Sequence, residues 1–220
     1  MVAQNLSAVL HTLPEGVQLV AVSKFHPVEA LQQAYDAGQR LFGESRVQEL
    51  NEKRRHLPAD IRWHFIGHLQ TNKVRQLIGN VDMIESVDSD RLLRLIDKES
   101  AAAGVVTRVL LQVHVAAEET KFGFLPDELS EWFRSGGYTT LKATHICGLM
   151  AMASNTDDDE RVRADFHAVA GLMARIKAEN PDLRGFDILS MGMSHDYPLA
   201  IAEGATHVRV GSAIFGERKY

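Results

Sequence analysis

A regular alternation of short apolar runs with longer amphipathic segments is the feature that most restricts the fold of this chain. The alternation continues from Val17 to Gly211 without a low-complexity linker. Short runs rich in β-branched residues favour buried strands, and the amphipathic stretches between them favour helices. Eight strands are predicted, at residues 18–23, 40–43, 63–67, 83–87, 108–115, 145–150, 186–190 and 207–210.

Helix signals occupy the stretches between these strands. Pro27 suits the first turn of a helix over 27–37, and Ser89 is a predicted N-cap for 89–103. A longer helix is predicted over 158–178, and its acidic start at 157–160 is explained by the helix macrodipole rather than by a functional acidic cluster. The pattern is therefore one of repeated βα units.

Uninterrupted βα units predict parallel strands joined by right-handed crossovers. Closing such a sheet into a barrel removes both exposed edges. With 220 residues the chain is shorter than the typical barrel of about 250 residues, so residues 6–13 are expected to serve as a closing helix. We predict a single α/β domain over residues 1–220, a (β/α)8 TIM barrel, with a doubly wound open sheet as the alternative.

Composition excludes several classes of partner. The 24 Lys and Arg residues are outnumbered by 29 Asp and Glu, so there is no general attraction to nucleic acid. Cys147 is the only cysteine, which excludes an internal disulfide and fits a reducing compartment. No apolar run reaches 18 residues, and residues 1–13 do not resemble a signal peptide. We therefore expect a soluble cytoplasmic protein that binds neither nucleic acid nor membrane.

Lys24 follows the first predicted strand directly, and alternation places it on one face with Val20 and Val22. An amine at the end of an apolar stripe loses hydration, which disfavours its charged form. The neutral amine is the nucleophile that forms a Schiff base with an aldehyde. A solvated lysine at a strand end is the alternative.

Glycine and serine follow the last two predicted strands. The turn at 189–194 contains Ser190 and Ser194, and Gly211 and Ser212 follow the eighth strand. In barrels of this kind the loops after strands seven and eight commonly bind phosphate through backbone N–H groups and hydroxyls. Ordinary turn formation is the alternative for each loop taken alone.

Arg209 precedes Gly211 by two residues, so both side chains are expected on the barrel interior. A buried guanidinium needs a partner. The expected partner is a ligand ring nitrogen, a ligand carboxylate, or an acid on a neighbouring strand such as Glu44 or Glu85.

Several motifs along the chain are shared with one known family. The shared motifs are Ala21-Val22-Ser23-Lys24 with Pro27; Phe42-Gly43-Glu44 with Gln48-Glu49; Trp63-His64-Phe65-Ile66-Gly67-His68-Leu69-Gln70 with Asn72-Lys73; Glu85-Ser86-Val87-Asp88; Lys121-Phe122-Gly123; Gly148-Leu149-Met150; Leu189-Ser190-Met191-Gly192-Met193-Ser194 with Asp196; and Val208-Arg209-Val210-Gly211 with Phe215-Gly216. Together these motifs resemble those of the pyridoxal phosphate homeostasis proteins, and the resemblance extends over nearly the whole chain. The chain departs from that family at Ser45 and His114, where asparagine is usual.

The resemblance implies a barrel like the N-terminal domain of alanine racemases, with pyridoxal 5′-phosphate held as an aldimine on Lys24. It implies a phosphate site in the last two loops and places Arg209 against the pyridine nitrogen, where a cation makes the ring a poorer electron sink. The residues expected to bind the cofactor are Lys24, Ser190, Met193, Ser194, Arg209, Gly211 and Ser212.

Alanine racemases use a second base, a tyrosine from a separate domain, and no such module follows Gly211 in this sequence. Tyr35, Tyr138, Tyr197 and Tyr220 are expected to be packing or surface residues. We therefore favour a carrier that takes part in the intracellular homeostasis of pyridoxal phosphate and amino acids and passes the cofactor to apoenzymes. The alternative is a one-base enzyme, a slow racemase or transaminase.

Two lesser expectations complete the sequence-based description. A metal site at His64 and His68 is disfavoured, because no nearby carboxylate is expected to complete a ligand set. Cys147 is expected to be a buried, inert thiol. Without the domain through which racemases dimerise, we expect a monomer.

Overall fold

The strands of this computed structural model, which describes residues 1–117 and 122–217, form one closed parallel barrel. Lys121 and Tyr220 lie outside the described residues. The strands follow chain order around the barrel, and β8 pairs with β1 in register from Gln18 opposite His207 to Ala21 opposite Val210. The strands are β1 (Gln18–Val22), β2 (Leu41–Glu44), β3 (Arg62–Phe65), β4 (Met83–Val87), β5 (Thr107–Val113), β6 (Thr144–Ala151), β7 (Ile188–Ser190) and β8 (His207–Val210). The predicted barrel is confirmed, and the open-sheet alternative is wrong.

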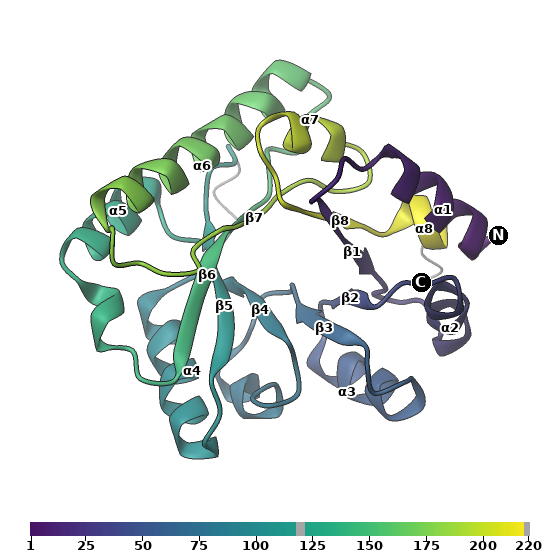
Figure 1. The fold of residues 1–220 in the computed structure, drawn as a ribbon, viewed down its shortest axis with the longest axis horizontal. Helices are drawn as coiled ribbons and strands as arrows, with labels where there is room; N and C mark the ends of the chain where they lie inside the picture. Colours follow the sequence, from purple (N-terminus) through teal and green to yellow (C-terminus); the bar gives the residue numbers. More distant parts are fainter. Residues whose placement is uncertain (118–121, 218–220) are drawn as a thin grey trace.

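The helices surround the barrel on its outside (Figure 1). They are α1 (Val2–Thr12), α2 (Val28–Asp36), α3 (Val47–His56), α4 (Asp90–Ala103), α5 (Pro126–Arg134), α6 (Asp159–Glu179), α7 (Tyr197–Ala202) and α8 (Ser212–Phe215), with 3-10 turns η1 (Thr71–Gln76) and η2 (Gly137–Thr140). Among the described residues, none of these helices has the length and apolar character needed to cross a membrane.

Capping explains where two of the predicted helices begin. The Ser89 hydroxyl accepts the amide hydrogen bond of Leu92 at the start of α4, as expected. The Asp158 carboxylate accepts from the amides of Glu160 and Arg161, so this acidic residue caps the start of α6, in addition to the favourable interaction with the macrodipole that was expected there.

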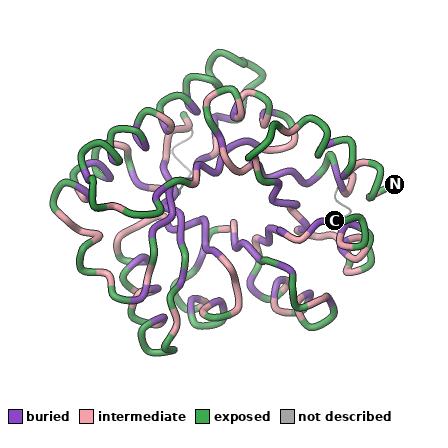
Figure 2. The backbone as a smooth tube through the Cα atoms, viewed as in Figure 1, coloured by how far each residue is buried: buried purple, intermediate pink, exposed green. Residues whose placement is uncertain are grey.

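The main core lies between the barrel wall and the helices, and the inner surfaces are buried while the outer helix faces are exposed (Figure 2). The barrel interior has a smaller apolar cluster of Met83, Leu110, Cys147 and Met150. Cys147 is buried as predicted, and burial raises the pKa of its thiol.

The helix predicted over residues 6–13 is present, although α1 spans Val2–Thr12 and the barrel itself is closed by the pairing of β8 with β1. Helix α1 packs against α8, and the Asn5 side-chain amide donates to the carbonyl of Ile214 over 3.1 Å. The turn after β8 is therefore held from outside by the first helix. This turn carries Gly211 and Ser212 at the carboxyl end of the barrel, where barrel enzymes place their sites.

Candidate functional site

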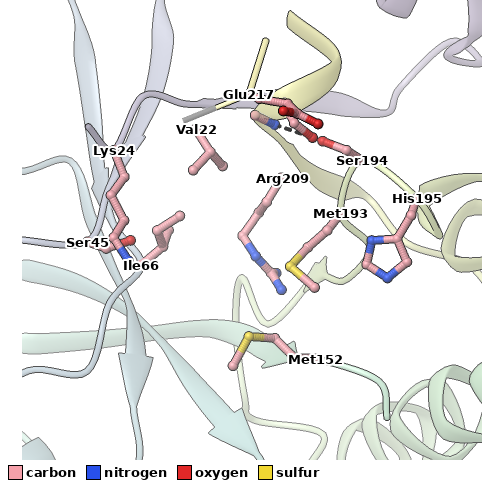
Figure 3. A pocket seen from close by; sticks show the side chains of 12 residues that line it. Val22, Lys24, Ser45, Ile66, Met152, Met193, Ser194, His195, Arg209 and Glu217 are labelled. Carbon is pink, nitrogen blue, oxygen red and sulfur yellow. Dashed lines mark hydrogen bonds between the residues drawn. The ribbon is translucent and has the colours of Figure 1, made fainter. Parts of the chain in front are cut away.

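A pocket of about 510 Å³ opens at the carboxyl end of the barrel. Its wall includes most of the residues predicted to bind a cofactor: Lys24, Met193, Ser194, Arg209, Gly211 and Ser212. Figure 3 shows Lys24 on one side, beside Ser45 and Ile66, and Arg209 and Met193 across the open space from it. Residues from the first and last strands therefore meet in one cavity.

Lys24 is partly buried and follows β1. Its ammonium lies 4.8 Å from the centroid of the Phe25 ring. Among the described residues it takes part in no hydrogen bond or ion pair. The amine is thus at the pocket wall and is not occupied by a carboxylate.

The turn after β8 has backbone donors gathered around one point. The Ser194 hydroxyl accepts from the amide of Gly211 at 3.1 Å (Figure 3). It also accepts from the amide of Ala213 at 3.5 Å. A β-carbon at Gly211 would lie 3.0 Å from the carbonyl oxygen of Val22, so glycine permits this close approach of β8 to β1. Amides that converge on one oxygen form an arrangement suited to an anion such as phosphate.

Arg209 is buried, and its guanidinium is fixed by two neutral acceptors. It donates to the Ser190 hydroxyl over 2.7 Å and to the Ala151 carbonyl over 2.8 Å. The Ser190 hydroxyl in turn donates to Glu85 over 2.6 Å, and the Glu85 carboxylate lies 3.9 Å from the guanidinium. Of the two acids considered from sequence, Glu85 is thus the one beside Arg209.

Ser190 is the one expected cofactor-binding residue that the structure does not bring to the pocket wall. It is fully buried, and its hydroxyl is shared between Glu85 and Arg209. Strand alternation places this side chain inside the barrel, where it reaches the Arg209 guanidinium.

A buried polar chain continues from Glu85 across the barrel. His64 hydrogen-bonds to Glu85 through Nδ1, and its Nε2 lies 3.5 Å from Asp82. Burial opposes the charge on His64, but the hydrogen bonds to Asp82 and Glu85 outweigh burial and raise its pKa. Burial also opposes ionisation of Glu85, yet the hydrogen bond and charge of His64 and the charge of Arg209 lower its pKa to about 2.

The two histidines considered from sequence as metal ligands each lie beside carboxylates in the folded chain. His64 contacts Asp82 and Glu85, and His68 lies 3.0 Å from Asp88. These are pairs that only the folded barrel brings together. Within residues 1–117 and 122–217, no group of three or more His, Cys, Asp and Glu side chains is arranged to hold a metal ion.

Several wall residues were not predicted from sequence. Ile66 and Met152 supply apolar surface, and His195 and Glu217 supply titratable groups. His195 is adjacent to Ser194 in the turn after β7, so its position next to a predicted phosphate loop was an available signal. Ser45, identified from sequence only as a departure from the family, also lines the pocket.

Comparison with known proteins defines the class first. A family model described as alanine racemase, N-terminal domain, matches residues 1–219. Alanine racemase from E. faecalis, at 19% identity, superposes with a TM-score of 0.73 over 98% of this chain and 57% of that chain, and shares the fold.

More similar proteins narrow the class. A pyridoxal phosphate homeostasis protein of Aquifex aeolicus is 42% identical over 92% of this chain and 88% of its own, and one of Schizosaccharomyces pombe is 40% identical over 92% and 85%. PipY of Synechococcus elongatus, solved with PLP bound, is 38% identical, with a TM-score of 0.90 over 98% of this chain and 100% of that chain. The chain belongs to the pyridoxal phosphate homeostasis protein family, within the alanine racemase N-terminal domain fold.

Proposed function

We propose that this chain binds pyridoxal 5′-phosphate in the pocket as an aldimine on Lys24, and that it takes part in the intracellular homeostasis of that cofactor and of amino acids. One observation carries the proposal. A lysine amine without a carboxylate partner, at the end of β1, faces the same cavity as the converging amides after β8. The similarity to PipY, solved with PLP bound, supports the choice of ligand.

The structure suggests a role for each predicted residue. Backbone amides at Gly211 and Ala213, with the Ser194 and Ser212 hydroxyls, would bind the phosphate. Arg209 would face the ring nitrogen, and its charge would discourage protonation there.

Two further residues complete the proposed assignment. Met193 would contact the ring from the pocket wall. We assign Ser190 to positioning the Arg209 guanidinium in place of a phosphate contact, because its hydroxyl is bonded to that group.

Lys24 would supply the covalent link. Its neutral amine would add to the aldehyde carbon, and loss of one water molecule would leave a carbon–nitrogen double bond. The phosphate would stay on the opposite side of the pocket, held by the turn after β8. Binding would then be reversible, since addition of water to the same bond regenerates the aldehyde and the amine.

A carrier is the function we favour over an enzyme. None of the described tyrosines lines the pocket, and tyrosine is the second base in the racemases that the fold resembles. The Tyr35 hydroxyl donates a hydrogen bond to the Asp60 carboxylate, and the Tyr197 hydroxyl is hydrogen-bonded to the Thr12 hydroxyl. We infer that the protein is a cytoplasmic monomer whose cofactor passes to apoenzymes, and the free, buried Cys147 fits a reducing compartment.

One observation favours the alternative, an enzyme acting on amino acids. The imidazole of His195 lines the pocket on the side opposite Lys24 (Figure 3), and histidine is a side chain that can serve as a second base. Incubation of the cofactor-loaded protein with single L-amino acids in deuterated water separates the two functions. Steady Cα exchange, followed by NMR and lost in both Lys24→Ala and His195→Ala, would establish the enzyme.

The site itself is tested by adding the cofactor, recording the visible spectrum, reducing with borohydride and mapping the labelled peptide. We expect the label on Lys24 and no label in Lys24→Ala. Label on another lysine in the wild-type protein would refute the assignment.

A further inference from the structure

A second lysine, Lys53 on α3, lies at the centre of a buried ionic cluster. Its ammonium donates to the carboxylate of Glu44, to that of Glu49 over 2.7 Å and to the Ser23 carbonyl over 2.7 Å. An ammonium has three N–H donors, so these acceptors use all of them. Lys53 is only 4% exposed, and its amine is thereby withheld from reaction.

The same cluster holds the backbone on both sides of Lys24. On the N-terminal side, the Ser23 hydroxyl donates a hydrogen bond to the Glu44 carboxylate over 2.7 Å, and the Ser23 carbonyl accepts one from the Lys53 ammonium. On the C-terminal side, the amide of Phe25 donates to Glu49 over 2.6 Å. Lys24 is thus the residue between two anchored neighbours, while its own amine stays outside the cluster.

The backbone of Phe25 shows why such anchoring is needed. Phe25 is the one non-glycine residue with positive φ in the described part of the chain, at 68°. A bulky residue in this region is strained, and the strain persists only where the surroundings impose it. Here Glu49 holds the amide, and the ring packs between the charges of Lys24 and Arg46, 4.8 and 4.5 Å from its centroid.

We propose that Glu49 and Lys53 are positioning residues, which fix the backbone at Lys24 so that its amine faces the pocket before any ligand arrives. The inference rests on the proposed function, in which Lys24 condenses with the cofactor aldehyde. Without Glu49, Phe25 relaxes toward ordinary negative φ, and Lys24 loses its fixed direction. The backbone at Lys24 and Phe25 must then become ordered before the amine can condense with the aldehyde, and the condensation is slower for that reason.

The test uses Glu49→Ala, with Glu52→Ala as its matched control. Glu52 is on the same helix and is exposed, and no hydrogen bond or ion pair of its carboxylate is found among the described residues. Stopped-flow absorbance after mixing apo-protein with pyridoxal 5′-phosphate gives the rate of Schiff-base formation. Since a hydrogen bond to a charged group is lost, we expect Glu49→Ala to react about tenfold to a hundredfold more slowly. The control should stay within about twofold of the wild type.

Glu49→Gln distinguishes positioning from a general electrostatic effect. The amide oxygen of glutamine can still accept from Phe25, so this variant should recover most of the rate. Lys53→Met is a less suitable probe, because it leaves the buried carboxylate of Glu44 and the partly buried carboxylate of Glu49 without their cation and can prevent folding. A Glu49→Gln protein as slow as Glu49→Ala would indicate that charge, rather than the backbone bond, governs the rate.

A second measurement needs no cofactor. In apo-protein, NMR hydrogen exchange at the Phe25 amide should be faster in Glu49→Ala by about tenfold or more and unchanged in Glu52→Ala. If exchange and condensation rates both match the wild type, the positioning role is refuted. If the wild-type protein forms no Schiff base at Lys24, the proposed function fails, and amide exchange still decides whether Glu49 orders this backbone.

Discussion

Glu85 is the residue whose replacement most directly tests the buried polar chain beneath the pocket. Its carboxylate is hydrogen-bonded to His64 and accepts a hydrogen bond from the Ser190 hydroxyl, and it lies 3.9 Å from the Arg209 guanidinium. Glu85→Gln keeps the shape of the side chain and removes its charge. Arg209 is then left buried with only the neutral oxygens of Ser190 and Ala151 as acceptors.

Two overlapping considerations, which share the charge of Arg209, give the size of the effect. A pKa lowered from 4.5 to about 2 corresponds to about 3 kcal/mol of preferential stabilisation of the Glu85 carboxylate in the folded protein. Coulomb attraction between unit charges 3.9 Å apart is about 4 kcal/mol at an effective dielectric constant of 20. Both agree with the range of about 3 to 5 kcal/mol for breaking a buried pair. We expect Glu85→Gln to lower the free energy of unfolding by about 3 kcal/mol at pH 7.

Urea unfolding followed by circular dichroism measures this difference, with exposed Glu52→Gln as the control. The folded pKa of Glu85 is lowered, so its contribution is fully present above pH 4.5 and is lost as pH falls toward 2. The gap between wild type and Glu85→Gln should therefore narrow on acidification. A loss below about 1 kcal/mol at pH 7, or a gap that widens in acid, would refute the electrostatic account.

Two further predictions concern the same barrel. Folding raises the pKa of His64, so its charge stabilises the fold below about pH 6.5, and this stabilisation is lost as the pH rises through the pKa of the folded state. In urea unfolding, His64→Gln should therefore lower the free energy of unfolding more at pH 6 than at pH 9.5. An equal loss of stability at pH 6 and at pH 9.5 would show that the charge of His64 does not stabilise the fold. A β-carbon at Gly148, where φ is 151°, would lie 1.8 Å from the Ile188 carbonyl oxygen, so Gly148→Ala should cost about 3 kcal/mol or more and lower the thermal midpoint. Gly171→Ala, in α6 with open space around it, should instead add about 0.5–1 kcal/mol, and equal midpoints for the two variants would contradict this packing argument.

The barrel was predictable because its strands are short β-branched runs at regular spacing, and because capping residues mark helix starts. Strand ends were less certain. The seventh strand was predicted to begin at residue 186, but β7 begins at Ile188. The fifth was predicted to reach residue 115, but β5 ends at Val113, where the amide of His114 instead donates to Phe124. Such ends depend on which partner backbone is available, which one sequence does not record.

The candidate site was predictable where a general rule of barrels assigns residues to strand ends, as for Lys24 and Gly211. It was not predictable where a pairing depends on the stagger between strands. The bond of Ser190 to Glu85 joins residues far apart in sequence, and so does that of His64 to Glu85. The anchoring of Lys24 through Lys53 was missed because a lysine inside a helix of high charge is ordinarily on the surface.

The meeting of β1 and β8 also determines when a ligand site exists at all. Lys24 and Gly211 belong to the first and last strands, and only the seam between these strands brings the two into one cavity. A ligand bound to both Lys24 and Gly211 would link β1 to β8. Such a ligand would stabilise the closed barrel relative to any partly opened form, and this stabilisation free energy would grow with the logarithm of the ligand concentration. Occupancy by the proposed cofactor and closure of the barrel would in this way be coupled.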